Sequence, residues 1–144
     1  KKVEAEEPAT PSEPAGDFVS LSFANKDSER KSYDSNAQVW EQNGIKFTNS
    51  KAASTTNVGD YANPVRCYQN SDIKIEYTAN IAKIVLNCDT SKMAAAFNVT
   101  GATVDVNKDT GVVTITLTNA AKTVDITNLA AQTRIISIDV YPAK

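Results

Sequence analysis

Hydrophobic and polar residues alternate with a period of two along most of the chain from residue 17 onward. This alternation is the pattern of half-buried β-strands. It predicts eight or nine short strands, which include 19–23, 45–48, 73–77, 84–88, 104–106, 113–117, 124–126 and 136–140. Because paired sheets each bury one face, many short strands with almost no helix predict an all-β fold, an antiparallel β-sandwich.

Two segments depart from this alternation. Residues 91–97, which are rich in alanine, predict one or two helical turns with Thr90 or Ser91 as the N-cap. Residues 27–37 are polar, and we expect either a loop or a short turn of helix there.

The first sixteen residues differ from the rest in composition. They hold three of the five prolines and four glutamates, with Val3 as their one β-branched aliphatic residue. Such a segment cannot bury enough apolar area to offset its ordering entropy. We therefore expect a disordered acidic, Pro-rich tether over residues 1–16 and a single domain over residues 17–144.

The charge balance of the predicted domain is neutral. The chain has 15 basic and 17 acidic residues, and two lysines and four glutamates fall in residues 1–16, which leaves 13 of each sign. A neutral domain without a Lys/Arg cluster gives no electrostatic reason to bind nucleic acid or an anionic membrane. No apolar run approaches the ~20 residues of a transmembrane helix.

The start of the chain bears on localisation. Its acidic, Pro-rich sequence resembles the spacer that follows the lipidated cysteine in surface lipoproteins of Gram-negative bacteria, which implies a secreted or cell-surface protein with a lipid anchor upstream of residue 1. An interdomain linker or a cloning boundary is the alternative.

A long polar loop carries the candidate binding residues. Fifteen mostly small or polar residues, Asn49 to Asn63, interrupt the strand pattern, and a polar loop of this length in a compact β-domain is often functional. Aromatic rings stack on the C–H face of a sugar, while arginine, amide and carboxylate groups bond to its hydroxyls. The predicted carbohydrate site comprises Trp40, Asn57, Asp60, Tyr61, Asn63, Arg66 and Tyr68.

Each of these residues also has a structural interpretation. Trp40 is better explained as a core or rim anchor, because large aromatic side chains dominate core energetics. Tyr61 and Tyr68 would cap the edge of the sandwich, and Arg66 would pair with a nearby acid. The alternation nevertheless predicts that Arg66 and Tyr68 point outward and that Cys67 is buried.

Residues 105–111 read D-x-N-x-D-x-G, with oxygen ligands at alternate positions as in a calcium loop. The glycine is one position late for an EF-hand, and Thr116 stands where its final glutamate belongs. Valines alternate on both sides of the segment, so we predict a hairpin turn in which Gly111 supplies a positive φ. We predict no metal and no other cofactor.

Catalytic groups are scarce in this sequence. It contains no histidine, which removes Ser-His-Asp catalysis and the usual activator of a cysteine nucleophile. Cys67 and Cys88 both fall on inward faces, and we favour two free buried thiols over a disulfide. The acidic residues lie at expected turns or outward strand positions, so we predict a protein that is not an enzyme.

Two segments resemble a known family, and a third resembles another group of surface proteins. Residues 81–88 (IAKIVLNC) are similar to the central core strand, and residues 132–141 (QTRIISIDVY) to the closing strand, of galactose-binding-like jelly-roll domains, which include many carbohydrate-binding modules. Residues 37–68 resemble surface modules of gut anaerobes. The resemblance implies a jelly-roll sandwich whose ligands lie in loops at one end, and a structural calcium is frequent in the family.

The leading expectation is therefore non-catalytic binding of a glycan or polysaccharide. The alternative is an Ig-like structural or adhesion spacer. A sugar site predicts that the aromatic residues and Arg66 converge on one surface, whereas a spacer predicts that they are dispersed or buried.

Overall fold

The computed structural model describes residues 16–144, so the predicted tether lies outside the described residues except for Gly16. The described chain forms nine strands and one four-residue helix: β1 (Val19–Ser22), α1 (Lys26–Glu29), β2 (Arg30–Tyr33), β3 (Ala37–Gln42), β4 (Ile45–Ser50), β5 (Val65–Cys67), β6 (Asp72–Cys88), β7 (Ala102–Asn107), β8 (Val112–Ile126) and β9 (Thr133–Pro142). The all-β prediction is confirmed.

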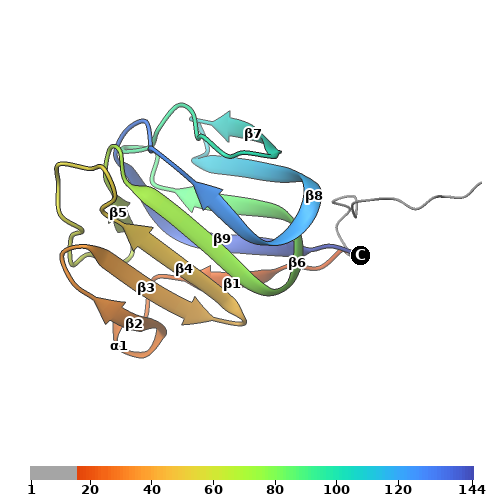
Figure 1. Ribbon diagram of the computed structural model, residues 1–144, viewed down its shortest axis with the longest axis horizontal. Coiled ribbons are helices and arrows are strands. Elements are labelled where there is room, and N and C mark those ends of the chain that lie inside the picture. Colours follow the sequence, from red (N-terminus) through yellow and green to blue (C-terminus); the bar gives the residue numbers. More distant parts are fainter. Residues whose placement is uncertain (1–15) are drawn as a thin grey trace, which may run out of the picture.

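All strand pairs are antiparallel and belong to one strongly curled sheet (Figure 1). The order β1-β9-β6-β4-β3-β2 forms its main path, with β5 beside β9, β8 beside β6 and β7 beside β8. The last strand therefore lies next to the first, and β6 lies near the centre of the sheet.

Two long bent strands, β6 and β8, produce the curl. The first part of β6 pairs with β4 and with the end of β8, and its second part pairs with β9 and with the start of β8. The register shifts between Glu76 and Lys83. Sequence reasoning divided each of these strands in two, because the polar and small residues at 78–80 (TAN) and 118–121 (TNAA) break the alternation. Those segments contain neither glycine nor proline, so the chain bends there and stays in the sheet.

The curl brings the two halves of the sheet against one another around a single core. Phe23, just after β1, packs edge-on against Trp40 of β3 and Phe47 of β4, with ring centroids 5.1 and 4.8 Å away. The Ser22 amide also donates across the same junction to the side-chain oxygen of Gln42, at 2.8 Å. Each fully buried large apolar side chain contributes about 1.5–3 kcal/mol, so this core supplies most of the driving force for the curl.

The helical prediction was wrong for residues 91–97. Their backbone forms turns, because the Asp89 carboxylate accepts from the Ser91 amide and the Ala94 amide donates to the Thr133 hydroxyl. These bonds replace the i to i−4 pattern of a helix. The described helix is α1, which overlaps the start of the polar segment 27–37 where a loop or short helical turn was expected, and β2 occupies residues 30–33 of that segment.

The hairpin predicted at residues 105–111 is confirmed. β7 pairs with β8 from Ala102↔Leu117 to Asn107↔Val112. Gly111 has φ +78°, and the Asn107 side-chain oxygen accepts from the amides of Asp109 and Thr110. The side-chain oxygen of Asn107 therefore stabilises the turn.

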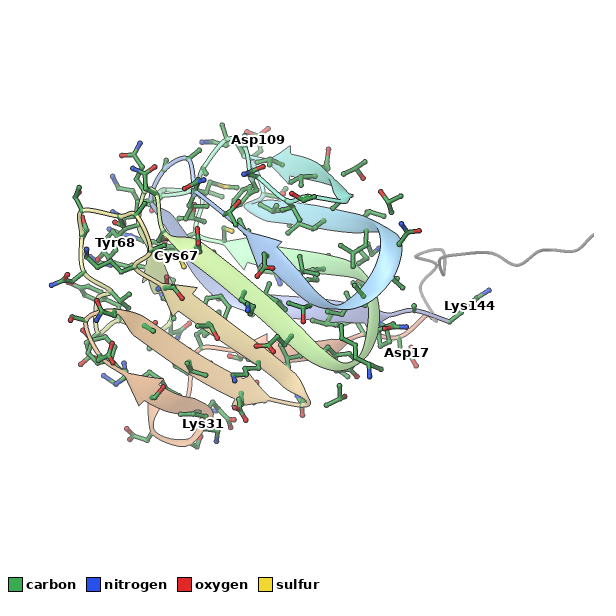
Figure 2. The ribbon with its side chains drawn as sticks, in the orientation of Figure 1. Asp17, Lys31, Cys67, Tyr68, Asp109 and Lys144 are labelled. Carbon is green, nitrogen blue, oxygen red and sulfur yellow. The ribbon has the colours of Figure 1, made fainter. Side chains whose placement is uncertain are left out.

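The domain has two opposite ends. Asp17 and Lys144 lie together at one end, and Tyr68 lies at the other (Figure 2); the pairing of Val19 with Val140 also joins the two termini of the fold. We call the segments 51–64, 68–71 and 127–132 the loop end. Hydrogen bonds from the Asn70 amide to Leu129 and from the Leu129 amide to Ser71 hold two of these segments together.

Candidate functional site

The polar loop 51–64 is fastened to its neighbours by backbone hydrogen bonds. The Lys51 amide donates to the Asn36 carbonyl at 2.8 Å, and the Val58 amide donates to the Ser35 carbonyl at 2.9 Å. The Tyr33 hydroxyl donates to the Val58 carbonyl at 2.9 Å. These bonds give a long loop a defined path, so the side chains that it carries are positioned by the sheet.

Two buried amide side chains form hydrogen bonds with the backbone of the candidate residues. Gln38 of β3 and Asn49 of β4 lie directly opposite one another and are 0% and 1% exposed. The Gln38 amide group donates to the Tyr61 carbonyl at 3.2 Å, and the Asn49 amide group donates to the Arg66 carbonyl at 3.0 Å. A buried carbonyl that loses its donor costs about 1–3 kcal/mol, so both bonds fix the backbone of the site.

Tyr61 and Tyr68 meet at Gly59, Arg66 lies over the Tyr61 ring, and we call these four residues the Tyr–Arg cluster. The Arg66 guanidinium carbon lies 3.7 Å from the Tyr61 ring centroid, in a cation–π contact. A Cβ atom on Gly59 would lie 2.6 Å from Cδ2 of Tyr61 and 3.1 Å from the Tyr68 hydroxyl. Glycine therefore lets the two tyrosines approach one another, and Tyr61 remains 42% exposed.

Asp60 is already paired with basic residues of the preceding elements. Its carboxylate lies 2.6 Å from the Arg30 guanidinium and 3.3 Å from the Lys26 ammonium. Hydrogen bonds from Arg30 and then Lys26 hold the pKa of Asp60 below its ordinary value. Arg30 also lies over the Tyr33 ring, 4.8 Å from its centroid. A second arginine–tyrosine pair therefore adjoins the Tyr–Arg cluster.

The remaining predicted site residues have different positions. Trp40 is 0% exposed and packs in the core, so its interpretation as a core anchor is confirmed and it is no stacking surface for a ligand. Asn57 and Asn63 are exposed on the loop, and their side chains form no hydrogen bond with residues 16–144. Both amides are therefore available to a ligand.

Several residues of this surface were missed by sequence reasoning. Arg30 and Tyr33 belong to β2, whose register shifts between its pairs with Trp40 and Val39, and no alternation marked that strand. Arg134 of β9 lies directly opposite Arg66 of β5. Strand adjacency brings these residues to the site, and a single sequence carries no signal for it.

The two cysteines are free and buried, as favoured from the sequence. Cys67 pairs with Thr133 and Cys88 pairs with Ile135, so β9 runs between them. Two strand spacings are roughly 10 Å, beyond the ~7 Å Cα separation that a disulfide tolerates. Burial raises the pKa of Cys88 to about 12 and that of Cys67 still further, with a smaller contribution from Cys88. Both thiols are therefore protonated and inert at neutral pH.

Within residues 16–144, no group of three or more histidine, cysteine, aspartate or glutamate side chains is arranged to hold a metal ion. The helix in this part of the chain is too short to cross a bilayer.

Comparison of the chain with protein-family models, with curated proteins and with solved structures finds no match.

Proposed function

We propose that this chain is a non-catalytic carbohydrate-binding module that contacts a glycan through the Tyr–Arg cluster at its loop end. The observation that carries the proposal is the convergence of these residues: Tyr61 and Tyr68 meet at Gly59, and Arg66 lies over the ring of the exposed Tyr61. A sugar site requires this convergence, whereas a spacer gives no reason for it.

The exposed groups suit a polyhydroxylated ligand. The accessible part of the Tyr61 ring offers an apolar surface for sugar C–H groups. The Arg66 guanidinium and the Asn57 and Asn63 amides offer donors and acceptors in fixed directions. Because the loop is already fastened to the sheet, little conformational entropy is lost when the ligand binds.

The fold and location belong to the same proposal. We infer a jelly-roll sandwich of the galactose-binding-like kind, and the pairing of β9 with β1 supports it, since a Greek-key connection returns a later strand to the side of the first. We also propose display at a bacterial cell surface, through a lipid anchor upstream of residue 1. The opposite positions of the chain ends and the loop end (Figure 2) suit such display.

A structural or adhesion spacer is the second candidate. The burial of Trp40 and the pairing of Asp60 with Arg30 and Lys26 favour it, because these residues already have structural roles. The adjacent positions of residues 19 and 140 argue against it. A spacer that separates its neighbours needs its two connections at opposite ends.

A glycan array probed with the full 144-residue chain tests the proposal. Wild type is compared with Tyr61→Ala, Arg66→Ala and Arg66→Lys, and with Tyr141→Ala as the matched tyrosine control at the opposite end. Circular dichroism and thermal melting establish that each variant is folded. Arg66→Lys keeps the charge but loses the planar guanidinium, so it separates stacking and bidentate contacts from simple attraction.

The proposal predicts binding to a defined class of glycan. Tyr61→Ala and Arg66→Ala should each weaken this binding at least about tenfold, since each removes a stacking or charged contact, and Tyr141→Ala should not. Absence of binding to any glycan would overturn the proposed function and favour the spacer. Binding that both loop-end substitutions leave intact would overturn the proposed site.

A further inference from the structure

A hollow of about 380 Å³ lies beside the bend of β8, and its lining contains no residue of the Tyr–Arg cluster. Its lining comprises the polar residues Thr100, Asn119, Thr123, Asp125 and Thr127, which we call the rim, and the small or apolar residues Gly101, Leu117, Ala121 and Val124. In Figure 1 this part of β8 curves away from the short strand β7.

The path of residues 98–101 explains how the hollow arises. The Thr118 amide donates to the Gly101 carbonyl at 2.8 Å, and the Thr127 amide donates to the Asn98 carbonyl at 3.1 Å. The Asn98 amide group also donates to the Thr127 hydroxyl at 2.9 Å. The segment 98–101 thus contacts β8 at two points, and β8 bends away from it between them.

Four of the five rim side chains are free to bond to a ligand, and Thr127 is the exception because its hydroxyl accepts from Asn98. Thr100, Asn119, Thr123 and Asp125 form no side-chain hydrogen bond with any residue from 16 to 144, although they stand close enough to line one hollow. Ala121 is the partly exposed apolar residue of the lining, whereas Leu117 and Val124 are 5% and 3% exposed and pack in the core. Free hydroxyl, amide and carboxylate groups beside a small apolar surface are a combination that orients a small polar ligand.

The same lining disfavours other occupants. It includes one carboxylate and no basic side chain, so an anion finds no counter-charge and a divalent cation finds too few carboxylates. An extended peptide would need an open edge along β8, and the hydrogen bonds at Thr118 and Thr127 close that edge at both ends. A neutral ligand with several hydroxyl groups can form hydrogen bonds with the polar side chains of the rim.

We propose that this hollow binds a single neutral sugar residue, at a site separate from the loop end. The sugar places its C–H face against Ala121, and its hydroxyls bond to Asn119, Thr123 and Asp125. The proposal does not depend on the loop-end site, because the two surfaces share no residue.

The test is an NMR titration of the ¹⁵N-labelled full chain with D-glucose, D-galactose, D-mannose and N-acetyl-D-glucosamine. At least one sugar should cause saturable shifts in the amides of residues 99–101 and 117–127. Asp125→Asn and Asn119→Ala should each weaken this binding about tenfold, because each removes a hydrogen-bonding group. Asp105→Asn, an exposed strand aspartate on β7, is the matched control and should leave it unchanged. Tyr61→Ala should also leave it unchanged.

Three results would overturn the hollow as a sugar site. The first is the absence of shifts there with all four sugars. The second is shifts confined to residues 57–68, which would support the loop-end function while removing this site. The third is binding at the hollow that Asp125→Asn and Asn119→Ala do not weaken. If only the loop-end proposal is wrong, the glycan array shows no binding, while the NMR titration still shows sugar binding at the hollow.

Discussion

The loop end and the hollow beside β8 both expose hydrogen-bonding side chains, but they differ in whether those side chains contact one another. At the loop end the groups contact one another, with Arg66 stacked on Tyr61 at 3.7 Å and Asp60 bonded to Arg30 at 2.6 Å. In the hollow, Asn119, Thr123 and Asp125 have no such partners among residues 16–144. A prearranged surface loses less entropy on binding, so we expect the loop end to give the tighter site.

The comparison also separates two uses of aromatic residues within one stretch of sequence. Trp40 and Tyr61 are twenty-one positions apart, yet Trp40 is 0% exposed and Tyr61 is 42% exposed. Trp40 stabilises the curl of the sheet against Phe23, and Tyr61 presents a ring to solvent. Substitutions at the two positions should therefore affect different properties of the protein.

The largest expected effect comes from Trp40→Ala. Loss of a fully buried tryptophan should lower the free energy of unfolding by about 3–5 kcal/mol, measured by urea denaturation. Tyr61→Ala should change it by less than about 1 kcal/mol while it weakens glycan binding. Equal losses of stability in the two variants would contradict the division between core and surface.

A pair of glycine substitutions tests the hairpin that frames the hollow. Gly111 and Gly101 have φ angles of +78° and +75°. A Cβ atom on Gly111 would overlap the carbonyl oxygen of Cys88, whereas one on Gly101 meets nothing within 4 Å. Gly101→Ala should cost about 1 kcal/mol for its backbone conformation alone, and Gly111→Ala about 3 kcal/mol or more. Similar denaturation midpoints for the two variants would contradict the overlap between a Cβ atom at position 111 and the Cys88 carbonyl oxygen.

Alkaline pH should destabilise the fold through its two thiols. In the unfolded chain a thiol loses its proton above its ordinary pKa of 9.0, while folded Cys88 keeps its proton up to about pH 12 and burial raises the pKa of Cys67 as well. The folded state therefore binds more protons in this window. Stability is fully present below pH 9 and falls above it, by about 1.4 kcal/mol per pH unit for each thiol.

The control for this pH dependence is the double variant Cys67→Ala/Cys88→Ala. The two proteins share every other side chain, so the difference between their denaturation curves from pH 8 to 11 isolates the thiols. The variant should lose less stability across this range than wild type. Parallel curves would show that the thiols are accessible in the folded state.

The smallest expected effect is that of Asp60→Asn. Asp60 is an exposed partner of Arg30 and Lys26, and exposed ion pairs contribute little to stability. Its thermal midpoint should stay close to that of wild type, and glycan binding through Tyr61 and Arg66 should persist. A large loss of binding would place Asp60 among the ligand contacts and extend the site toward α1.

Alternation in the sequence correctly predicted the all-β class, because it records which side chains face the core. Val65, Cys67, Ile84, Leu86 and Cys88 are all buried as expected. The same signal failed at residues 78–80 and 118–121, where polar and small residues mark a bend within a strand. It failed also at residues 91–97, where Asp89 and Thr133 bond to amides that a helix would have used.

The candidate site was less predictable than the fold. Tyr61, Arg66 and Tyr68 were found because they share one loop and its exit strand. Arg30, Tyr33 and Arg134 reach the same surface through strand pairing, and the hollow depends on the bend of β8. These features arise from strand order, which a single sequence does not encode in any local pattern.

The most direct test of the central claim is the dissociation constant of an oligosaccharide selected on the array, measured by calorimetry for the wild-type chain, Tyr61→Ala, Asp125→Asn and the double variant. A dominant loop-end site predicts that Tyr61→Ala weakens binding at least about tenfold and that Asp125→Asn changes it much less. Equal affinity of the wild type and Tyr61→Ala would contradict the loop end as the glycan-binding surface.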